Sequence, residues 1–292
     1  EESYAMSVVH AQRLVFCLAG QSNMAGRGAL PVTTPPGDVR IRSFSQRSDV
    51  WETAANPLHS DKPEKAGVGP GLSFARVLLR ALPSQQIMLV PCAWGGSPIS
   101  RWAAKGGDLF NEAKRRTQLA LEQAGEGAVL AGILWHQGES DCGEVGQAES
   151  HMRETADALA HLREELGAPT TPILAGELGN FLDRNDSRFA FADIVNAGIA
   201  GLPKQLTSCT LVTAHGLGHR GDRLHFDTAA QNELGARYGA AWLRVSGILS
   251  NHVVAAKDAE ASDLVVGTCM ENVTDVSSVT EAAGTCEVGE LD

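Results

Sequence analysis

The sequence contains no apolar run that approaches the ~18–20 residues needed to cross a membrane as a helix. It also has no excess of positive charge. The formal net charge of −11 disfavours nucleic acid or an anionic membrane surface as a partner. Nothing in the pattern predicts an obligate protein partner, and a neutral or sugar-like substrate is not opposed by this charge.

The six cysteines include no CxxC pair, so a zinc or redox site has little support, and we expect neither a metal nor a cofactor. Cys17, Cys92 and Cys209 lie in apolar, strand-like runs and are expected to be buried. Cys269 and Cys286 lie near the end of the chain, and the sequence leaves open whether they pair.

A basic segment followed by an apolar one, the pattern of a secretory leader, is also missing. The chain begins with Glu1 rather than Met. The sequence therefore predicts no compartment, and an incomplete N-terminus, a cytoplasmic location and secretion all stay open.

Short apolar runs alternate with amphipathic segments along most of the chain, which predicts a parallel, doubly wound α/β sheet. Core strands are expected at 13–19, 87–90, 129–135, 172–178 and 210–214, with a possible short strand at 39–44. Helices are expected at 70–82, 108–124, 145–166, 187–200 and in the segment that ends at about 245.

The composition divides the chain into three parts. Residues 1–12 are a short lead-in, and residues 13–248 hold the alternating pattern as one domain. Residues 249–292 are acidic and rich in Ser, Thr, Ala and Gly, which predicts a mostly disordered tail. Inside the domain, residues 27–70 are rich in Gly, Pro, Ser and Asp, and loops of this length are usually functional or disordered.

The strand at 13–19 ends at a glycine, and Gln21, Ser22 and Asn23 follow at once. Open α/β folds bind ligands at the carboxyl ends of their strands, which makes Ser22 a candidate nucleophile. The competing interpretation is a helix cap, a common role for serine. The segment is not the G-x-S-x-G elbow of α/β-hydrolases, because position 24 is Met.

Further strand-end loops offer the partners that a nucleophilic Ser22 needs. His225 is the candidate base, and Asp222, three residues earlier, is the candidate acid that fixes its tautomer. His215 and His219 are rival bases. Asp222 is alternatively an N-cap of the last helix.

The remaining polar residues of these loops suggest an oxyanion hole. Gly95 and Gly96 offer backbone N–H groups, and Gln137 offers a side-chain N–H. The alternative role of Gln137 is a hydrogen bond to a neighbouring loop. Glu139 either assists His225 or holds a loop by capping or a salt bridge.

Two further kinds of side chain flank the candidate site. Trp94, Trp102 and Trp135 are either core packing or a platform on which a sugar stacks. Gln21 and Asn23, on either side of the candidate nucleophile, are expected to shape its loop or to contact substrate.

The chain resembles the SGNH-type hydrolases in four blocks that follow the family's order: Gly20-Gln21-Ser22-Asn23-Met24, Trp94-Gly95-Gly96-Ser97, Trp135-His136-Gln137-Gly138-Glu139-Ser140 and Asp222-x-x-His225-Phe226. Within them it is most similar to the sialate O-acetylesterase domain and to carbohydrate esterase family six, including its plant members. The resemblance covers about residues 13–245 and leaves the tail out.

The resemblance implies a flavodoxin-like, three-layer α/β/α fold with a central parallel sheet of about five strands. It also implies hydrolysis of acetyl esters on carbohydrates without a metal. Carried over to this chain, Ser22 is the nucleophile, His225 the base and Asp222 the acid partner.

The resemblance further implies an oxyanion hole made by the Ser22 N–H, a glycine of 95–96 and Gln137, which stands where many SGNH enzymes have Asn. Some members rely on a Ser-His dyad helped by the Glu of the third block. Asp222 and Glu139 therefore both stay open as the acid partner.

The sequence thus predicts a serine esterase that removes acetyl groups from a carbohydrate through an acetyl-enzyme. One alternative is a lipase- or thioesterase-like hydrolase of longer acyl esters, and another is a carbohydrate-binding protein with a degenerate site. A phosphate-binding interpretation lacks both a Walker lysine frame and a G-x-G-x-x-G turn. Residues 27–70 carry no pattern that identifies the sugar.

Overall fold

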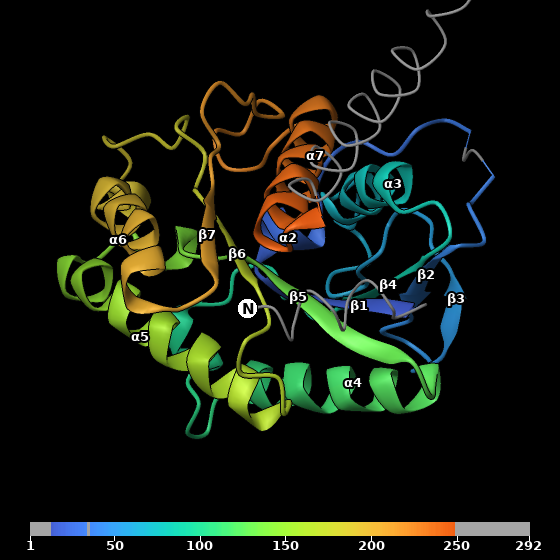
Figure 1. Ribbon diagram of the computed structural model, residues 1–292. Helices are drawn as coiled ribbons and strands as arrows, with labels where there is room; N and C mark the ends of the chain where they lie inside the picture. The colour runs from blue at the N-terminus through green and yellow to red at the C-terminus, as the bar shows by residue number, and fades with distance from the viewer. Residues whose placement is uncertain (1–12, 34–35, 249–292) are drawn as a thin grey trace, which may run out of the picture. The chain divides into compact units, whose positions relative to one another are not determined.

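The apolar runs of the sequence form the strands of one sheet (Figure 1). The structure, a computed structural model, describes residues 13–33 and 36–248. Five strands correspond to the five predicted core runs: β1 (Arg13–Gly20), β4 (Gln86–Pro91), β5 (Ala128–His136), β6 (Ile173–Gly176) and β7 (Cys209–Val212). β1 is buried from its second residue onwards, as expected for a parallel strand covered on both faces.

Two shorter strands extend the sheet beyond β4. β2 (Ile41–Phe44) runs parallel to β4, and β3 (Trp51–Thr53) pairs antiparallel with β2. The order is β3-β2-β4-β1-β5-β6-β7, so the described residues form seven strands rather than about five. The five core strands keep the flavodoxin-like order, with β1 between β4 and β5. β3 was not predicted because its three residues, two of them exposed, carry no apolar period.

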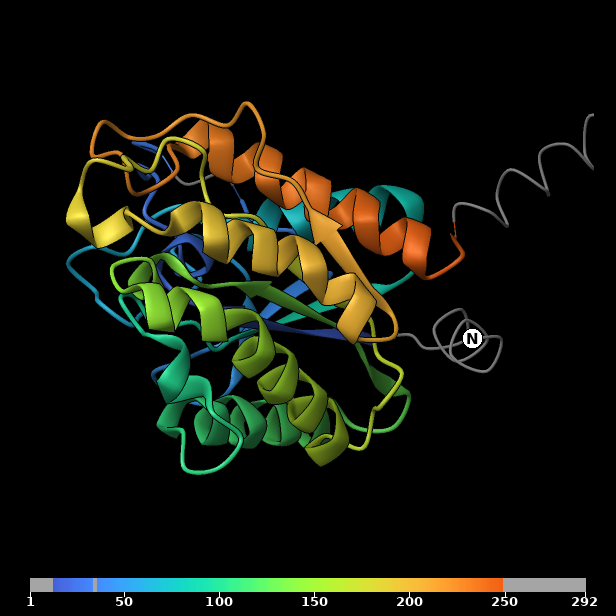
Figure 2. The ribbon, with the colours of Figure 1, turned by 90° about the vertical axis from the view of Figure 1, so that its left-hand side faces the viewer.

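Helices cover both faces of this sheet, which confirms the three-layer α/β/α fold (Figures 1 and 2). The two helical layers are α3 (Gly71–Ala81) with α7 (Thr228–Val245), and α4 (Asp108–Ala124) with α5 (Val145–Glu165) and α6 (Ala192–Gln205). In both views α7 lies above the sheet and α4 and α5 lie below it. An apolar cluster under each layer forms the core.

The predicted helix at 187–200 has the wrong bounds. α6 begins at Ala192 and continues to Gln205. Residues 187–189 form a separate 3-10 turn, in which Asp186 accepts a hydrogen bond from the Arg188 N–H. This cap satisfies the start of the short turn, and the helix proper begins only after it.

β1 is the central strand, and it leads directly to Ser22. The ring of Phe16 lies edge-on to Phe74 of α3 and to Trp242 of α7, with centroid separations of 4.8 and 5.3 Å. Aromatic pairs of this kind contribute about 0.5–1.5 kcal/mol each beyond their buried area. The Trp242 indole also donates to the Ala131 carbonyl on β5 at 2.6 Å. The strand that leads to Ser22 is therefore held in place by the helical layer of α3 and α7.

Some predictions fall on residues outside the described ranges: the lead-in 1–12, the tail 249–292, and the pairing of Cys269 with Cys286. Cys17 and Cys92 are buried as predicted. Cys209 is only partly buried, because it opens the edge strand β7. Within the described part of the chain, no helix is both long and apolar enough to cross a membrane.

Candidate active site

The carboxyl ends of β1, β4 and β5 lie side by side at the middle of the sheet. After β1, Gly20 adopts φ 130°, and Ser22–Ala25 form the single-turn helix α2. A Cβ at Gly20 would lie 2.1 Å from the His136 carbonyl oxygen, so only glycine permits this approach of β1 to β5. Ser22 follows at the carboxyl edge of the sheet, and it is 6% exposed.

A cavity of about 540 Å³ is lined by Ser22, and residues of the other strand-end loops share its wall. Gly96 and His225 come from two of these loops, and Lys62 comes from the 27–70 segment. The described residues contain no group of three or more His, Cys, Asp or Glu side chains arranged to hold a metal ion. The cavity therefore joins the predicted loops into one candidate site.

Ser22, His225 and Asp222 form a continuous hydrogen-bonded chain. His225 Nε2 is 3.1 Å from Ser22 Oγ, and His225 Nδ1 is 2.7 Å from Asp222 Oδ2. With Nδ1 donating to the carboxylate, Nε2 is left to accept the serine proton. Burial alone would raise the pKa of Asp222, but hydrogen bonds from the backbone and ring of His225 outweigh burial and lower it.

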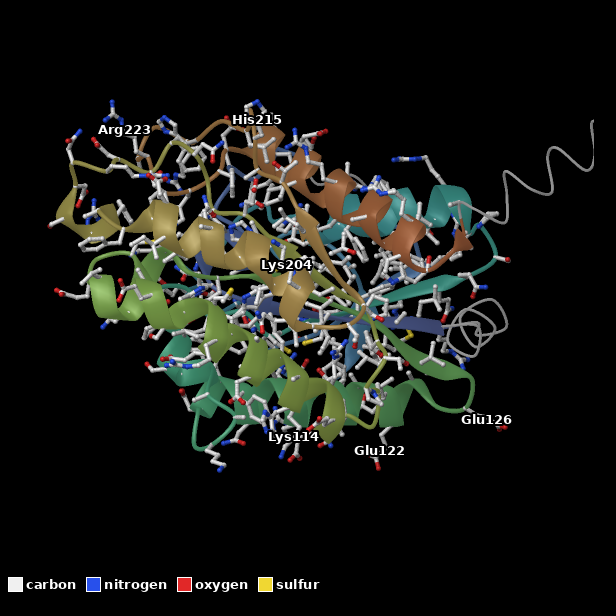
Figure 3. The ribbon with its side chains drawn as sticks, turned by 60° about the vertical axis from the view of Figure 1, so that its left-hand side comes forward. Lys114, Glu122, Glu126, Lys204, His215 and Arg223 are labelled. Carbon is white, nitrogen blue, oxygen red and sulfur yellow. The ribbon has the colours of Figure 1, made fainter. Side chains whose placement is uncertain are left out.

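The rival histidines hold other positions. His219 Nδ1 accepts hydrogen bonds from the Gly221 and Arg223 N–H groups at 3.0 and 3.2 Å, so it shapes the turn around Asp222. His215 is exposed, and Figure 3 shows it at the molecular surface. Neither ring takes the position beside the serine.

Asn23 joins the turn Ser22–Ala25, the candidate nucleophile turn, to the segment that carries His225. Its side-chain NH2 donates to Glu139 Oε1 at 2.5 Å and to the Leu224 carbonyl oxygen at 3.1 Å. Its oxygen accepts the Phe226 N–H at 3.1 Å. Because Asn23 is fully buried and is not part of the cavity wall, it supports the site rather than contacting substrate.

Glu139 is held by Asn23 and lies beside His136, whose Nε2 is 3.5 Å from the carboxylate. Burial alone would raise the pKa of Glu139, but the neighbouring His136 and the hydrogen bond from Asn23 outweigh burial and lower it. Of the two acids that the sequence leaves open, Asp222 is the one whose carboxylate contacts the His225 ring.

Two backbone N–H groups of the cavity wall have no hydrogen-bond partner within the described residues. They belong to Ser22 itself and to Gly96, which both line the cavity. Gly96 adopts φ 73°, a conformation that favours glycine. Gly95 is different, because its N–H donates to Asp61 Oδ2 at 2.8 Å. Of the two glycines predicted as oxyanion donors, Gly96 is therefore the one whose N–H is free in this structure.

Gln137, also predicted as an oxyanion donor, donates elsewhere in this structure. Its side chain is fully buried, and Nε2 donates to the Ser97 carbonyl at 3.0 Å and to the Asp141 carboxylate. The side-chain oxygen is 2.8 Å from His151 Nε2. Both amide protons are used inside the protein, so Gln137 ties the loop after β5 to the loop after β4.

Gln21 and Trp94, predicted as substrate or support residues, differ in position. Gln21 lines the cavity, but its side-chain oxygen accepts the Gly138 and Ser140 N–H groups at 3.2 and 3.4 Å. It therefore orders the loop after β5. Trp94 is 39% exposed, is not part of the cavity wall, and lies under the Arg101 guanidinium at 5.8 Å.

The other two tryptophans belong to the core. Trp102 and Trp135 are each 1% exposed, and their rings meet edge to face at 5.1 Å. Burial of this degree excludes the sugar-stacking role for both. The Trp102 indole also donates to Ser97 Oγ at 3.1 Å, which helps to fix the loop after β4.

Residues 12–244 match the family model described as carbohydrate esterase, sialic acid-specific acetylesterase. The chain belongs to this family. The protein is therefore a carboxylic ester hydrolase. A protein of Arabidopsis thaliana named "probable carbohydrate esterase" is 33% identical to this esterase over 248 residues, which are 78% of this chain and 90% of that protein.

Solved structures share the fold of this esterase. The crystal structure of the Arabidopsis thaliana protein has a TM-score of 0.71 at 32% identity, over 80% of this chain and 98% of that one. NanS has a TM-score of 0.64 at 20% identity, over 80% and 97% of the two chains. A carbohydrate acetylesterase of Xanthomonas citri has a TM-score of 0.57 at 20% identity, over 80% of this chain and 56% of that one. The last two similarities show the fold alone.

Sequence reasoning expected residues 27–70 to be functional but missed Arg27 and Asp61 in the site of this esterase. Arg27 lines the cavity and forms a buried ion pair with Asp61, at 2.6 Å. No local pattern links two charges separated by 34 positions in an aperiodic loop. The sequence therefore held no signal for this pair.

Proposed function

We propose that this esterase hydrolyses acetyl esters of carbohydrates, with Ser22 as nucleophile, His225 as general base and Asp222 as the acid that orients the base. The observation that carries the proposal is the 3.1 Å separation between His225 Nε2 and Ser22 Oγ in the cavity wall. This distance lies within the range for direct proton transfer from nucleophile to base.

In the acylation step, His225 Nε2 accepts the Ser22 hydroxyl proton while Oγ attacks the acetyl carbonyl carbon. Asp222 accepts the Nδ1 hydrogen bond and stabilises the imidazolium that forms. The carbonyl π electrons move to oxygen, and the free N–H groups of Ser22 and Gly96 are the donors available to bind it. Each donor of this kind contributes about 3–4 kcal/mol to stabilising the transition state.

The tetrahedral intermediate then expels the sugar alcohol, which takes its proton from His225 and leaves an acetyl group on Ser22 Oγ. In deacylation, His225 removes a proton from water, and the hydroxide oxygen attacks the acetyl carbonyl. Acetate leaves, and the proton returns from His225 to Ser22. The same base and the same donors therefore serve both halves of the reaction.

The acetylated carbohydrate as substrate is supported by the family and by the cavity wall. The charged and amide side chains of that wall include Lys62, Lys65, Glu144, Gln147 and Arg188. Its large apolar residues are Phe189 and Leu224. A lipase- or thioesterase-like activity lacks the support that the family match gives to an acetylated carbohydrate. A binding protein without activity is disfavoured by the aligned serine and histidine.

We assign the activity to residues 13–248 as a single domain. All described residues belong to one compact unit, and the family match covers nearly the same stretch, 12–244. Residues 249–292 lie outside that match and are proposed to be an acidic addition to the esterase domain.

The experiment is acetate release from a panel of acetylated polysaccharides and glycosides, with p-nitrophenyl acetate as a reference. Ser22→Ala is expected to abolish release, whereas Ser100→Ala, which changes an exposed serine outside the cavity wall, is expected to leave it unchanged. Wild-type turnover by Ser22→Ala would refute the proposed nucleophile. A series of acetyl, butyryl and octanoyl esters is expected to show a steep loss of activity, and a preference for octanoyl would favour the lipase-like alternative.

A further inference from the structure

Arg27, in the cavity wall, forms an ion pair with Asp61. Arg27 Nη2 and Asp61 Oδ2 are 2.6 Å apart, and the two side chains are 2% and 0% exposed. Burial alone would raise the pKa of Asp61, but the hydrogen bond from Arg27 and its charge outweigh burial and lower it. The Asp61 carboxyl is therefore charged at neutral pH. Arg27 Nη1 also donates to the Gly26 carbonyl at 2.8 Å.

The ion pair contacts both segments that carry the free N–H donors. On one side, Gly26 ends the nucleophile turn, and its own N–H donates to the Ser22 carbonyl at 2.9 Å. On the other side, Asp61 Oδ2 accepts the Gly95 N–H at 2.8 Å, one residue before Gly96. A single buried pair thus connects the turn after β1 to the loop after β4.

The loop after β4 has a glycine at the point of contact for a steric reason. A Cβ at Gly95 would lie 2.4 Å from Arg27 Nη2 and 3.0 Å from Asp61 Oδ2. Gly95 is not among the described residues with positive φ, so the backbone conformation does not require glycine here. The close approach of the ion pair does.

We propose that Arg27 and Asp61 are positioning residues that set the separation of the Ser22 and Gly96 N–H donors, and thereby how well the oxyanion is bound. This proposal rests on the proposed function, because only an oxyanion formed at Ser22 gives that separation a chemical consequence. The hydrogen bonds of the pair go to Gly26, to Gly95 and between its own members. Its effect is therefore exerted through the two loops.

A buried ion pair suits this task because it fixes geometry more than it adds stability. The guanidinium fork reaches both carboxylate oxygens, with Nη1 to Oδ1 at 3.4 Å and Nη2 to Oδ2 at 2.6 Å. Paired bonds of this type restrict orientation as well as distance. A misplacement of about 1 Å in a catalytic group can cost about 100-fold in rate, so small shifts of either loop would be measurable.

The test compares two variants of the pair with a matched control. Asp61→Ala removes the acceptor of the Gly95 N–H and leaves Arg27 unpaired. Arg27→Met/Asp61→Leu replaces the pair by apolar side chains, a change that buried ion pairs often tolerate without loss of stability. The control is Arg163→Met, because Arg163 is also buried. Arg163 donates to two carbonyl groups that precede β6 and β7, at the amino ends of the strands and so away from the site.

We expect both pair variants to lower kcat for p-nitrophenyl acetate by about 10–100-fold. KM is expected to change by less than about two-fold, because a donor that acts mainly on the transition state affects kcat. Arg163→Met is expected to lower Tm and to leave kcat unchanged below that Tm. Wild-type kcat in a folded double variant would overturn the proposal.

Amide hydrogen exchange of the wild-type protein tests the proposal without any variant. If Asp61 holds the Gly95 N–H, that amide is protected, while the Gly96 amide exchanges freely. Fast exchange at both positions would overturn the proposal, whether or not the variants fold. Ser22→Ala distinguishes failure of the proposed function from failure of the positioning role. Full activity of Ser22→Ala overturns the proposed function. An inactive Ser22→Ala together with full kcat in Arg27→Met/Asp61→Leu overturns only the positioning role.

Discussion

The half of the site around Ser22, the proposed nucleophile, and the half around His225, the proposed base, are built differently; they are called the nucleophile half and the base half. Ser22 is 6% exposed, and the neighbouring Asn23 is fully buried and hydrogen-bonded to residues far away in the chain. The side chains of His225 and Asp222 are 19% and 39% exposed, and their contact is made within one short turn. Long-range buried contacts hold the nucleophile half. In the base half the contact between His225 and Asp222 is local and near the surface, although Asn23 also ties the flanking Leu224 and Phe226 to the Ser22 turn.

Because of this difference, substitutions in the two halves are expected to affect stability and activity differently. Removing a buried polar partner leaves other buried groups unpaired, so changes in the nucleophile half are expected to reduce stability as well as activity. Changes in the exposed base half leave groups that water can satisfy, so they are expected to reduce activity alone.

The largest effect is expected from His225→Ala, which tests the base half. Loss of the general base is expected to lower kcat by about 10⁴–10⁶-fold. Because this side chain is partly exposed, the free energy of unfolding should change by less than about 1 kcal/mol. Steady-state kinetics and urea unfolding measure both quantities. His215→Ala is the control, and its exposed ring should affect neither. Equal kcat in the two variants would contradict the assignment of the base.

Asp222→Asn tests the acid partner in the same half of the site. The amide oxygen can still accept the N–H groups of the turn, but the charge that stabilises the imidazolium is lost, and kcat should fall about 10²–10⁴-fold. Glu139→Gln, in the buried half, should cost less in kcat and more in stability. Measured on p-nitrophenyl acetate and by urea unfolding, a reversed order would make Glu139 the acid partner of His225.

Asn23→Ala tests the buried half directly. It leaves the Glu139 carboxylate, the Leu224 carbonyl and the Phe226 N–H without their present partner. The expected loss is about 2–4 kcal/mol in the free energy of unfolding, with a fall in kcat because the His225 segment is no longer tied to the nucleophile turn. Asn185→Ala removes an exposed asparagine and should change stability by less than about 0.5 kcal/mol. Similar losses of unfolding free energy in both variants would contradict the claim that buried long-range contacts hold the nucleophile half.

The smallest expected effect is a pH dependence of the free energy of unfolding. Burial raises the pKa of Asp141 to about 6 from the usual 3.8, despite hydrogen bonds from Gln137 and Ile99. Between these values the folded protein binds more protons at Asp141 than the unfolded chain. The contribution of this group to stability is therefore full below about pH 4 and falls by up to about 3 kcal/mol as pH rises to about 6.

Asp141→Asn removes this titration. The difference in unfolding free energy between wild type and variant should change across about pH 4–6 and be flat at higher pH. Urea unfolding at a series of pH values measures it. A difference that does not vary across that window would show that Asp141 ionises normally in the folded protein.

Features set by nearby residues were predictable from the sequence. α4 has the predicted bounds, because its apolar period and the following glycine are local signals. The Ser22 turn and the His225 segment were found from strand ends and short motifs. β3 was missed because so short an exposed strand is determined by its pairing with β2 rather than by its own period.

Features set by distant residues were not predictable. Gln137 has the right chemistry for an oxyanion donor, but buried contacts with Ser97 and Asp141 use both amide protons. Gly95 and Gly96 look equivalent in the sequence, but the Gly95 N–H donates to the Asp61 carboxylate, whereas Gly96 adopts a positive φ. In each case the deciding partner comes from another loop, so no local pattern contains the answer.

The most direct measurement is the site of covalent acetylation during turnover. Wild-type protein is mixed with p-nitrophenyl acetate, quenched in acid within the first turnovers, digested and analysed by mass spectrometry. We predict one acetyl group on the peptide that contains Ser22, and none on that peptide from Ser22→Ala. An acetyl group at another residue, or active enzyme without any acetyl group at Ser22, would contradict the proposed mechanism.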